Sequence, residues 1–166
     1  MAELLYFEQQ TFDFAGALVA LDVDGTIVPD SGSCVSAAVL AQVGALKAAG
    51  NEIQLCSNSR RGDYAARLAD IASQLDVVVC PVLFRKPSML AIEKLERKGR
   101  ALVVIGDKDL TDGLLARRVG ARFIKVRRKI DPADRLSSRV ANLIDDVFGP
   151  PAIFLWDALS VLSGRG

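Results

Sequence analysis

Histidine is absent from this chain of 166 residues. Without it, the protein cannot use a Ser-His-Asp triad, a phosphohistidine intermediate or a zinc site with histidine ligands. Proton transfer in any active site would therefore depend on carboxylates, lysine or tyrosine.

Cysteine is scarce, with Cys34, Cys56 and Cys80 as the three examples. They lack the spacing of metal ligands, and an odd number without a secretory segment does not suggest a disulfide framework. We expect reduced thiols, with Cys56 and Cys80 in the core because each ends an apolar segment.

The chain also lacks a strong net charge and a long apolar run. Lys and Arg number 21 against 20 for Asp and Glu, so nucleic acid is not expected as a partner. No stretch reaches the roughly 20 apolar residues that cross a bilayer, and the first residues lack the basic region of a signal peptide. These absences predict a soluble, cytoplasmic protein without a transmembrane segment, and the length fits one domain over residues 1–166.

Two local concentrations stand out against this balanced composition. Basic residues gather between Arg117 and Lys129, where a solvated edge is the preferred interpretation and a site for an anionic surface is the alternative.

Residues 150–163 are apolar on nearly every side, and such a helix favours burial. This C-terminal segment could pack on the core, expected over about residues 15–148, pair with a second copy in a homo-oligomer, or lie at a membrane interface. The first two are preferred.

Two carboxylates end the first apolar segment of the chain. Residues 17–21 have the composition of a strand, and Asp22, Asp24 and Gly25 follow. Side chains two apart on a strand point the same way, and glycine permits a turn there. Such close carboxylates repel unless a cation binds or one holds a proton. The pair could bind a magnesium-type cation or supply a nucleophile, whereas the alternative is an Asp-rich turn that caps a helix.

Polar groups also follow later apolar segments. Residues 101–105 lead into Gly106 and a cluster of acids, Asp107, Asp109 and Asp112, and residues 52–56 lead into Ser57 and Asn58. A basic residue, Lys86, precedes a helix that starts at Pro87. Ligands of parallel sheets bind beyond the carboxyl ends of the strands, so we expect these groups to form one site.

Strand and helix patterns alternate along the chain, which predicts an α/β, Rossmann-like fold with right-handed crossovers and a parallel sheet. Strands are expected over residues 17–21, 52–56, 76–80, 101–105 and 121–126. Helices are expected over residues 34–49, 61–74, 87–98 and 111–119. Three of these helices are followed by a glycine, which is typical of a left-handed helix C-cap.

From Ala17 to Asp131, the ordered motifs resemble those of the haloacid dehalogenase (HAD) superfamily of phosphotransferases: DxD, a strand ending in Ser, a Lys, and an acidic segment. The residues in and around these motifs are most similar to the type IIIA, YqeG-like branch, which is related to phosphatidylglycerophosphate phosphatases. The resemblance implies a three-layer core with strand order 3-2-1-4-5. The intervals between motifs leave no room for a cap domain, so we expect an open site that admits a large phosphorylated partner, such as a lipid headgroup.

By resemblance, the catalytic residues are Asp22, Asp24, Ser57 and Lys86. Asp22 attacks phosphorus to form an aspartyl-phosphate, and Asp24 acts as general acid and then as general base. Ser57 and Lys86 bind the phosphoryl oxygens. The implied cofactor is Mg²⁺, held by the Asp22 carboxylate, the Asp24 backbone carbonyl and Asp107.

Other residues have supporting roles in this interpretation. Asn58 contacts substrate and Thr26 steadies the turn, although both could be local backbone caps. Asp112 orients Lys86 or the metal waters, and Asp109 faces solvent. The predicted function is Mg²⁺-dependent phosphomonoester hydrolysis, possible substrates being a phosphatidylglycerophosphate-like lipid or another large molecule. The alternatives are a phosphatase of a soluble sugar phosphate or nucleotide, and a non-catalytic HAD-fold binding module.

Overall fold

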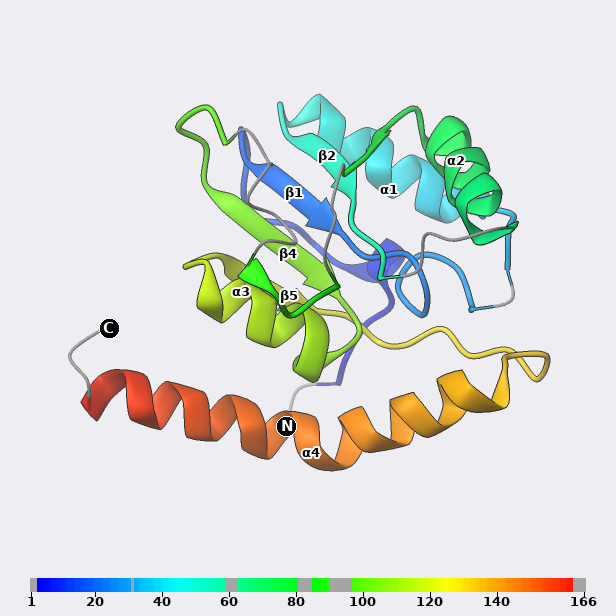
Figure 1. Ribbon diagram of the computed structural model, residues 1–166. Helices are drawn as coiled ribbons and strands as arrows, with labels where there is room; N and C mark the ends of the chain where they lie inside the picture. The colour runs from blue at the N-terminus through cyan, green and yellow to red at the C-terminus, as the bar shows by residue number, and fades with distance from the viewer. Residues whose placement is uncertain (1–2, 31, 59–62, 81–84, 90–96, 163–166) are drawn as a thin grey trace.

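A parallel sheet of five strands lies at the centre of the computed structural model of this chain (Figure 1). The structure describes residues 3–30, 32–58, 63–80, 85–89 and 97–162. The strands are β1 (Leu18–Leu21), β2 (Glu52–Leu55), β3 (Val78–Val79), β4 (Leu102–Gly106) and β5 (Arg122–Lys125). Their order is β3-β2-β1-β4-β5, which confirms the predicted α/β class and strand order 3-2-1-4-5.

The helices are α1 (Ala37–Ala48), α2 (Asp63–Leu75), α3 (Leu114–Arg118) and α4 (Leu136–Leu162), with a 3-10 helix η1 (Phe7–Gln9) and a π-helical turn η3 (Asp109–Gly113). Helix α1 starts later than predicted because Ser36 caps it, its Oγ accepting the Val39 N–H at 3.3 Å. The predicted helix over 111–119 is divided between η3 and α3. Most of the predicted helix over 87–98, and the start of the one over 61–74, lie outside the described residues.

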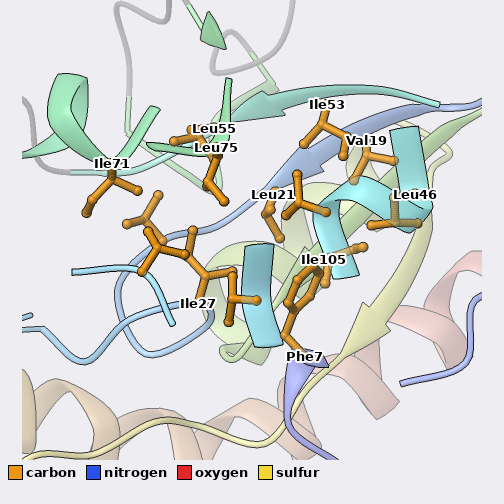
Figure 2. Packing of buried hydrophobic residues seen from close by; sticks show 14 of the residues in the cluster. Phe7, Val19, Leu21, Ile27, Leu46, Ile53, Leu55, Ile71, Leu75 and Ile105 are labelled. Atoms are coloured by element: carbon orange, nitrogen blue, oxygen red, sulfur yellow. The ribbon is translucent and has the colours of Figure 1, made fainter. Parts of the chain in front are cut away.

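Each face of the sheet carries its own apolar core because strand side chains alternate. On one face, Val19 and Leu21 pack with residues of α1 and α2, such as Leu46 and Ile71 (Figure 2). On the other face, Leu18 and Ala20 belong to a smaller cluster with Leu115 and Ala116 of α3, which includes the two cysteines predicted to be buried, Cys56 and Cys80. The sheet is thus covered on both sides, as parallel sheets require.

The register of the sheet aligns the carboxyl ends of its three central strands. Leu21 lies opposite Leu55 of β2 and Ile105 of β4. The pairing continues past β1, where the Asp22 N–H donates to the Ile105 carbonyl at 2.9 Å. The residues that follow these strands therefore emerge at one edge of the sheet.

Helix α4 extends along one side of the molecule and is bowed near its middle (Figure 1). Pro150 and Pro151 lie within it, and proline in a helix interior removes a hydrogen bond and bends the axis. Residues 150–162 of the predicted apolar segment therefore form the second half of a longer helix. We expected this segment to be buried on the core, but Phe154 remains 75% exposed.

The first half of α4 docks against η3 through small and polar groups. The Asp145 carboxylate accepts the N–H groups of Asp109 at 3.1 Å and Leu110 at 2.7 Å. At Gly149 the helix passes so close that an added Cβ would lie 2.8 Å from the Asp109 Cβ. Among the described residues, no helix has both the length and the apolar character needed to span a membrane.

Candidate active site

Three buried carboxylates meet at the carboxyl edge of the sheet. Asp22 follows β1, Asp107 follows β4, and Asp112 belongs to η3. Each offers one oxygen to a group of ligand atoms that lie within 4.8 Å of one another. The predicted acids after two separate strands are thus brought together, and Asp112 lies with them.

The Lys86 ammonium lies between two of these acids. Its Nζ donates to Asp22 Oδ1 and to Asp112 Oδ1, both at 2.5 Å, and the side chain is buried. Burial alone would lower the pKa of Lys86, but the charges of Asp112 and Asp22 raise it above its ordinary value. Lys86 is therefore a fixed positive charge at the centre of the cluster.

Burial raises the pKa of the Asp112 carboxyl group, although the neighbouring Lys86 charge opposes this rise. Lys86 alone cannot neutralise three carboxylates, and Asp107 has further cationic partners in Arg128 and Lys108. Thr26 adds a neutral donor, with its Oγ1 3.2 Å from Asp22 Oδ2 and 3.5 Å from Asp107 Oδ1. Thr26 thus links the turn after β1 to the acid after β4.

Asp24 points to different partners from Asp22. Its Oδ1 accepts a hydrogen bond from Arg67 Nη1 of α2 at 2.8 Å, and its Oδ2 lies 3.4 Å from Ser57 Oγ. Burial, with a contribution from the Asp22 charge, raises the pKa of Asp24 to about 6. A carboxyl group with such a pKa can both give and take a proton near neutral pH.

Ser57 and Asn58 follow β2 and lie beside the cluster. Ser57 Oγ shares a hydrogen bond with the Tyr64 hydroxyl at 2.9 Å. Asn58 Oδ1 accepts the Lys86 backbone N–H at 2.6 Å, and its Nδ2 lies 3.4 Å from the Lys86 carbonyl. Asn58 lines the pocket, but its amide also holds the backbone that carries the lysine.

Asp107 has cationic neighbours. Arg128 Nε donates to Asp107 Oδ2 at 2.5 Å, and Lys108 Nζ lies 3.2 Å from the same oxygen. Arg128 also reaches Asp145 of α4 at 3.3 Å, so one guanidinium joins the acid after β4 to the C-terminal helix. No sequence pattern pointed to this link, because Arg128 lies within the basic cluster interpreted as a solvated edge.

That interpretation of the basic cluster is wrong for Lys125, Arg128 and Lys129. Lys125 Nζ pairs with Asp109 Oδ2 at 2.6 Å, and Lys129 Nζ pairs with Glu8 at 2.6 Å. Asp109, expected to face solvent, is buried for the same reason. The loop after β5 turns back over the sheet edge, and this fold places its charges against acids that are distant in sequence.

A pocket of about 250 Å³ opens beside the cluster. Its lining comes from the edge of the sheet, the loop after β5 and the first half of α4: Asp22, Asp24, Gly25, Asp30, Ser57, Asn58, Lys86, Lys108, Thr111, Lys129, Asp134, Ser138, Ala141 and Asn142. The site is thus narrower than the open surface predicted from the lack of a cap domain, because α4 forms a wall. Ser138, Ala141 and Asn142 have the i, i+3, i+4 spacing of one helix face.

Asn142, on this wall, has a side-chain oxygen that accepts no hydrogen bond from the part of the chain that the structure describes. Asn142 lines the pocket, and its Oδ1 is buried without a hydrogen-bond partner among the described residues. A buried acceptor without a partner is costly, and such a group next to a pocket suits a ligand donor.

The donor set fits a hard divalent cation. The clustered atoms are carboxylate oxygens, which Mg²⁺ and Ca²⁺ prefer, and a cation would relieve their mutual repulsion. The turn after β1 also leaves room near Asp107: Gly25 has φ +82°, and a Cβ there would lie 2.7 Å from Asp107 Oδ2. A buried Asp triad that could hold an ion is therefore present.

Comparison with protein families gives one partial match. A family model described as HAD-hydrolase-like matches residues 83–148. This region contains Lys86, Asp107 and Asp112, but it covers less than half of the chain and does not reach Asp22 or Asp24. The match supports a relation to the HAD superfamily and a phosphatase-type hydrolase in general. No curated protein matches the chain.

Two solved structures are similar to this chain at low sequence identity. One, a crystal structure, has a TM-score of 0.56 and 11% identity, and the alignment covers 92% of this chain and 98% of the other. A second, from a structure of the Pnkp1/Rnl/Hen1 complex, has a TM-score of 0.48 and 14% identity over 76% of this chain. The present chain spans about half, 51%, of the length of that second chain.

Proposed function

We propose that this protein is a Mg²⁺-dependent phosphomonoester hydrolase that works through an aspartyl-phosphate intermediate. The observation that carries this proposal is the Lys86 ammonium held between Asp22 and Asp112, 2.5 Å from each, beside the acid cluster. A nucleophilic carboxylate, a fixed cation and candidate metal ligands are the groups that phosphoryl transfer requires.

In the first step, a carboxylate oxygen of Asp22 attacks phosphorus and the bond from phosphorus to the leaving oxygen breaks. Protonated Asp24 gives its proton to the departing alkoxide. Lys86 and Ser57 donate to the phosphoryl oxygens, where the transition state spreads negative charge. Arg67 holds Asp24 in place through the 2.8 Å contact described above.

In the second step, the Asp24 carboxylate takes a proton from water, and the water oxygen attacks phosphorus. The bond from phosphorus to Asp22 breaks, which releases inorganic phosphate and restores both carboxyl groups. Asp24 thus acts in both steps, first as a general acid that gives a proton and then as a general base that takes one back.

Asp22 and Asp107, with the Asp24 backbone carbonyl, would hold the metal, and Asp112 lies near enough to contribute or to orient metal-bound waters. When bound, Mg²⁺ neutralises the phosphoryl oxygens so that the anionic nucleophile can approach. Thr26 would keep the turn after β1 in register with Asp107 through its two contacts.

Two features of the protein bear on the class of substrate. Membership of the type IIIA, YqeG-like branch would favour a phosphatidylglycerophosphate-like headgroup or another large phosphorylated molecule. The wall formed by α4 favours instead a compact, polar leaving group, such as that of a sugar phosphate, since Ser138 and Asn142 line the pocket. A non-catalytic binding module is a weaker alternative, because the acids and the lysine of the reaction are all retained.

A phosphatase screen tests the proposal. Purified protein would be incubated with Mg²⁺ and a panel of lipid phosphates, sugar phosphates and nucleotides, and released phosphate would be measured. We expect turnover of at least one class, lost in the Asp22→Asn variant. Binding of phosphorylated compounds without turnover of any would support the binding module and contradict the enzyme.

Replacement of Asn142 tests the wall of the pocket. In Asn142→Leu, a side chain of similar size loses the buried acceptor, and we expect KM for a hydroxylated substrate to rise roughly 3- to 10-fold, the worth of one neutral hydrogen bond. KM for p-nitrophenyl phosphate, which lacks such hydroxyls, should be unchanged. Leu143→Ala, an exposed neighbour on the same helix, is the control. Equal KM changes for both substrates would contradict a role in recognising the leaving group.

A further inference from the structure

The first half of helix α4 turns polar groups toward the domain and apolar groups toward solvent, the reverse of an ordinary surface helix. On the inward face, Ser138 donates to Asp30 at 2.7 Å, and Asp145 accepts two backbone N–H groups of η3. Asp145 and Gly149 are the buried residues of this helix. The domain therefore contacts α4 through polar groups in its first half and through Ile153 in its second, while large apolar side chains on the outward face remain exposed in the described part of the chain.

The outward apolar face extends along the full helix. Large apolar side chains there are between 46% and 83% exposed. They are Leu136, Val140, Leu143, Ile144, Val147, Phe148, Phe154, Leu155, Leu159, Val161 and Leu162. These eleven residues, here called the α4 stripe, account for most of the exposed large apolar side chains in the ranges that the structure describes.

The size of the α4 stripe exceeds what a monomer usually exposes. Eleven side chains at such exposure present on the order of 1,000 Å² of apolar surface along a helix about 40 Å long. Monomeric proteins rarely expose contiguous apolar patches above a few hundred Å². A standard protein interface buries about 800 Å² on each partner, so the α4 stripe alone has the area that a stable dimer needs.

The charges around the α4 stripe distinguish between a lipid surface and a protein partner. Helix α4 has one basic residue, Arg139, and three acids, of which Asp146 and Asp157 are exposed. Anionic lipid attracts interfacial helices through lysine and arginine, and the exposed acids here would oppose that attraction. Two nearby arginines are already engaged, because Arg117 pairs with Asp157 and Arg128 pairs with Asp146.

We propose that the protein is a homodimer in which the α4 stripe packs against the same surface of a second copy. A two-fold interface uses one self-complementary patch twice, and a long helix with a continuous apolar face meets that requirement. The proposal goes beyond the enzymatic function and does not depend on it, because the outward face of α4 contributes none of the catalytic groups.

Sedimentation velocity or light scattering on the full chain tests the dimer. We expect the mass of two chains, and we expect Val147→Glu combined with Phe154→Glu to weaken dimerisation by at least about 100-fold, since central apolar residues dominate interface energy. Both side chains are exposed in the single chain, so the circular dichroism spectrum of the variant should remain that of a folded protein. Leu40→Glu makes the same kind of change at an exposed position of α1 and should leave the dimer intact.

Three outcomes would overturn the proposal. The intact chain could be monomeric at all accessible concentrations, or the dimer could persist in the double variant. The third outcome is a monomer that floats with vesicles of phosphatidylglycerol and phosphatidylcholine and loses this flotation in the double variant, which would assign the α4 stripe to a membrane surface. None of these measurements uses catalytic activity, so failure of the dimer is distinguishable from failure of the proposed reaction.

Discussion

Asp22→Asn is expected to reduce phosphatase turnover on the order of 10⁴-fold or more, because loss of a nucleophile removes the covalent route altogether. An asparagine Oδ1 can still accept the hydrogen bond from Lys86, so the change should preserve the local geometry. No histidine is available to replace the lost nucleophile. Initial rates with saturating Mg²⁺ and acid-quenched detection of the phospho-enzyme would measure the effect.

Asp109→Asn is a matched control for this substitution. Asp109 is also buried, but its carboxylate pairs with Lys125 and the residue does not line the pocket. We expect this variant to keep its turnover and to melt at a lower temperature. Asp22→Asn activity close to that of the unsubstituted protein would exclude the aspartyl-phosphate mechanism.

Removal of the metal is expected to have the second largest effect. Activity should vanish in EDTA and return with Mg²⁺, because the ion would supply positive charge between the substrate phosphate and the carboxylates of Asp22 and Asp107. Asp107→Ala should abolish activity or raise the Mg²⁺ concentration that half-restores it. Calorimetric titration with Mg²⁺ gives an independent readout, and the heat of binding should be lost in the variant.

Loss of Asp107 also leaves Arg128 without one of its partners, so stability must be separated from metal binding. Asp107→Asn keeps an acceptor for Arg128 and removes the negative charge, and we expect it to fold while it binds Mg²⁺ weakly. Full turnover by metal-free protein in chelator would contradict the metal assignment.

Much of the fold could be predicted because its signals are local. Alternating apolar segments and glycine-ended helices repeat along the chain, and short connections restrict such a pattern to parallel crossovers. The positions of Asp22, Ser57 and Asp107 followed from the same logic, since each residue comes within two positions of the end of a predicted strand. Strand order was the exception, because it came from resemblance to a family.

Residues that line or support the site from outside the sheet could not be predicted in this way. Arg67 lies within an ordinary amphipathic helix, and only the packing of α2 brings its guanidinium to Asp24. Arg128 and Asp109 were assigned to solvent because charged residues usually are. Their burial depends on ion pairs with partners that are distant along the chain.

The sequence by itself determined the α/β pattern, the exclusion of histidine chemistry and the acids at the strand ends, because each depends on residue type and on spacing within one element. The tertiary structure decided where α4 lies and which way it faces. The composition of residues 150–163 predicted an apolar helix but not what that helix contacts. Asp145 could dock on η3, and Asn142 could reach the pocket, only after the loop from β5 had returned the chain to the edge of the sheet. That return is a long-range arrangement, and its free energy comes from contacts that no single segment of sequence contains.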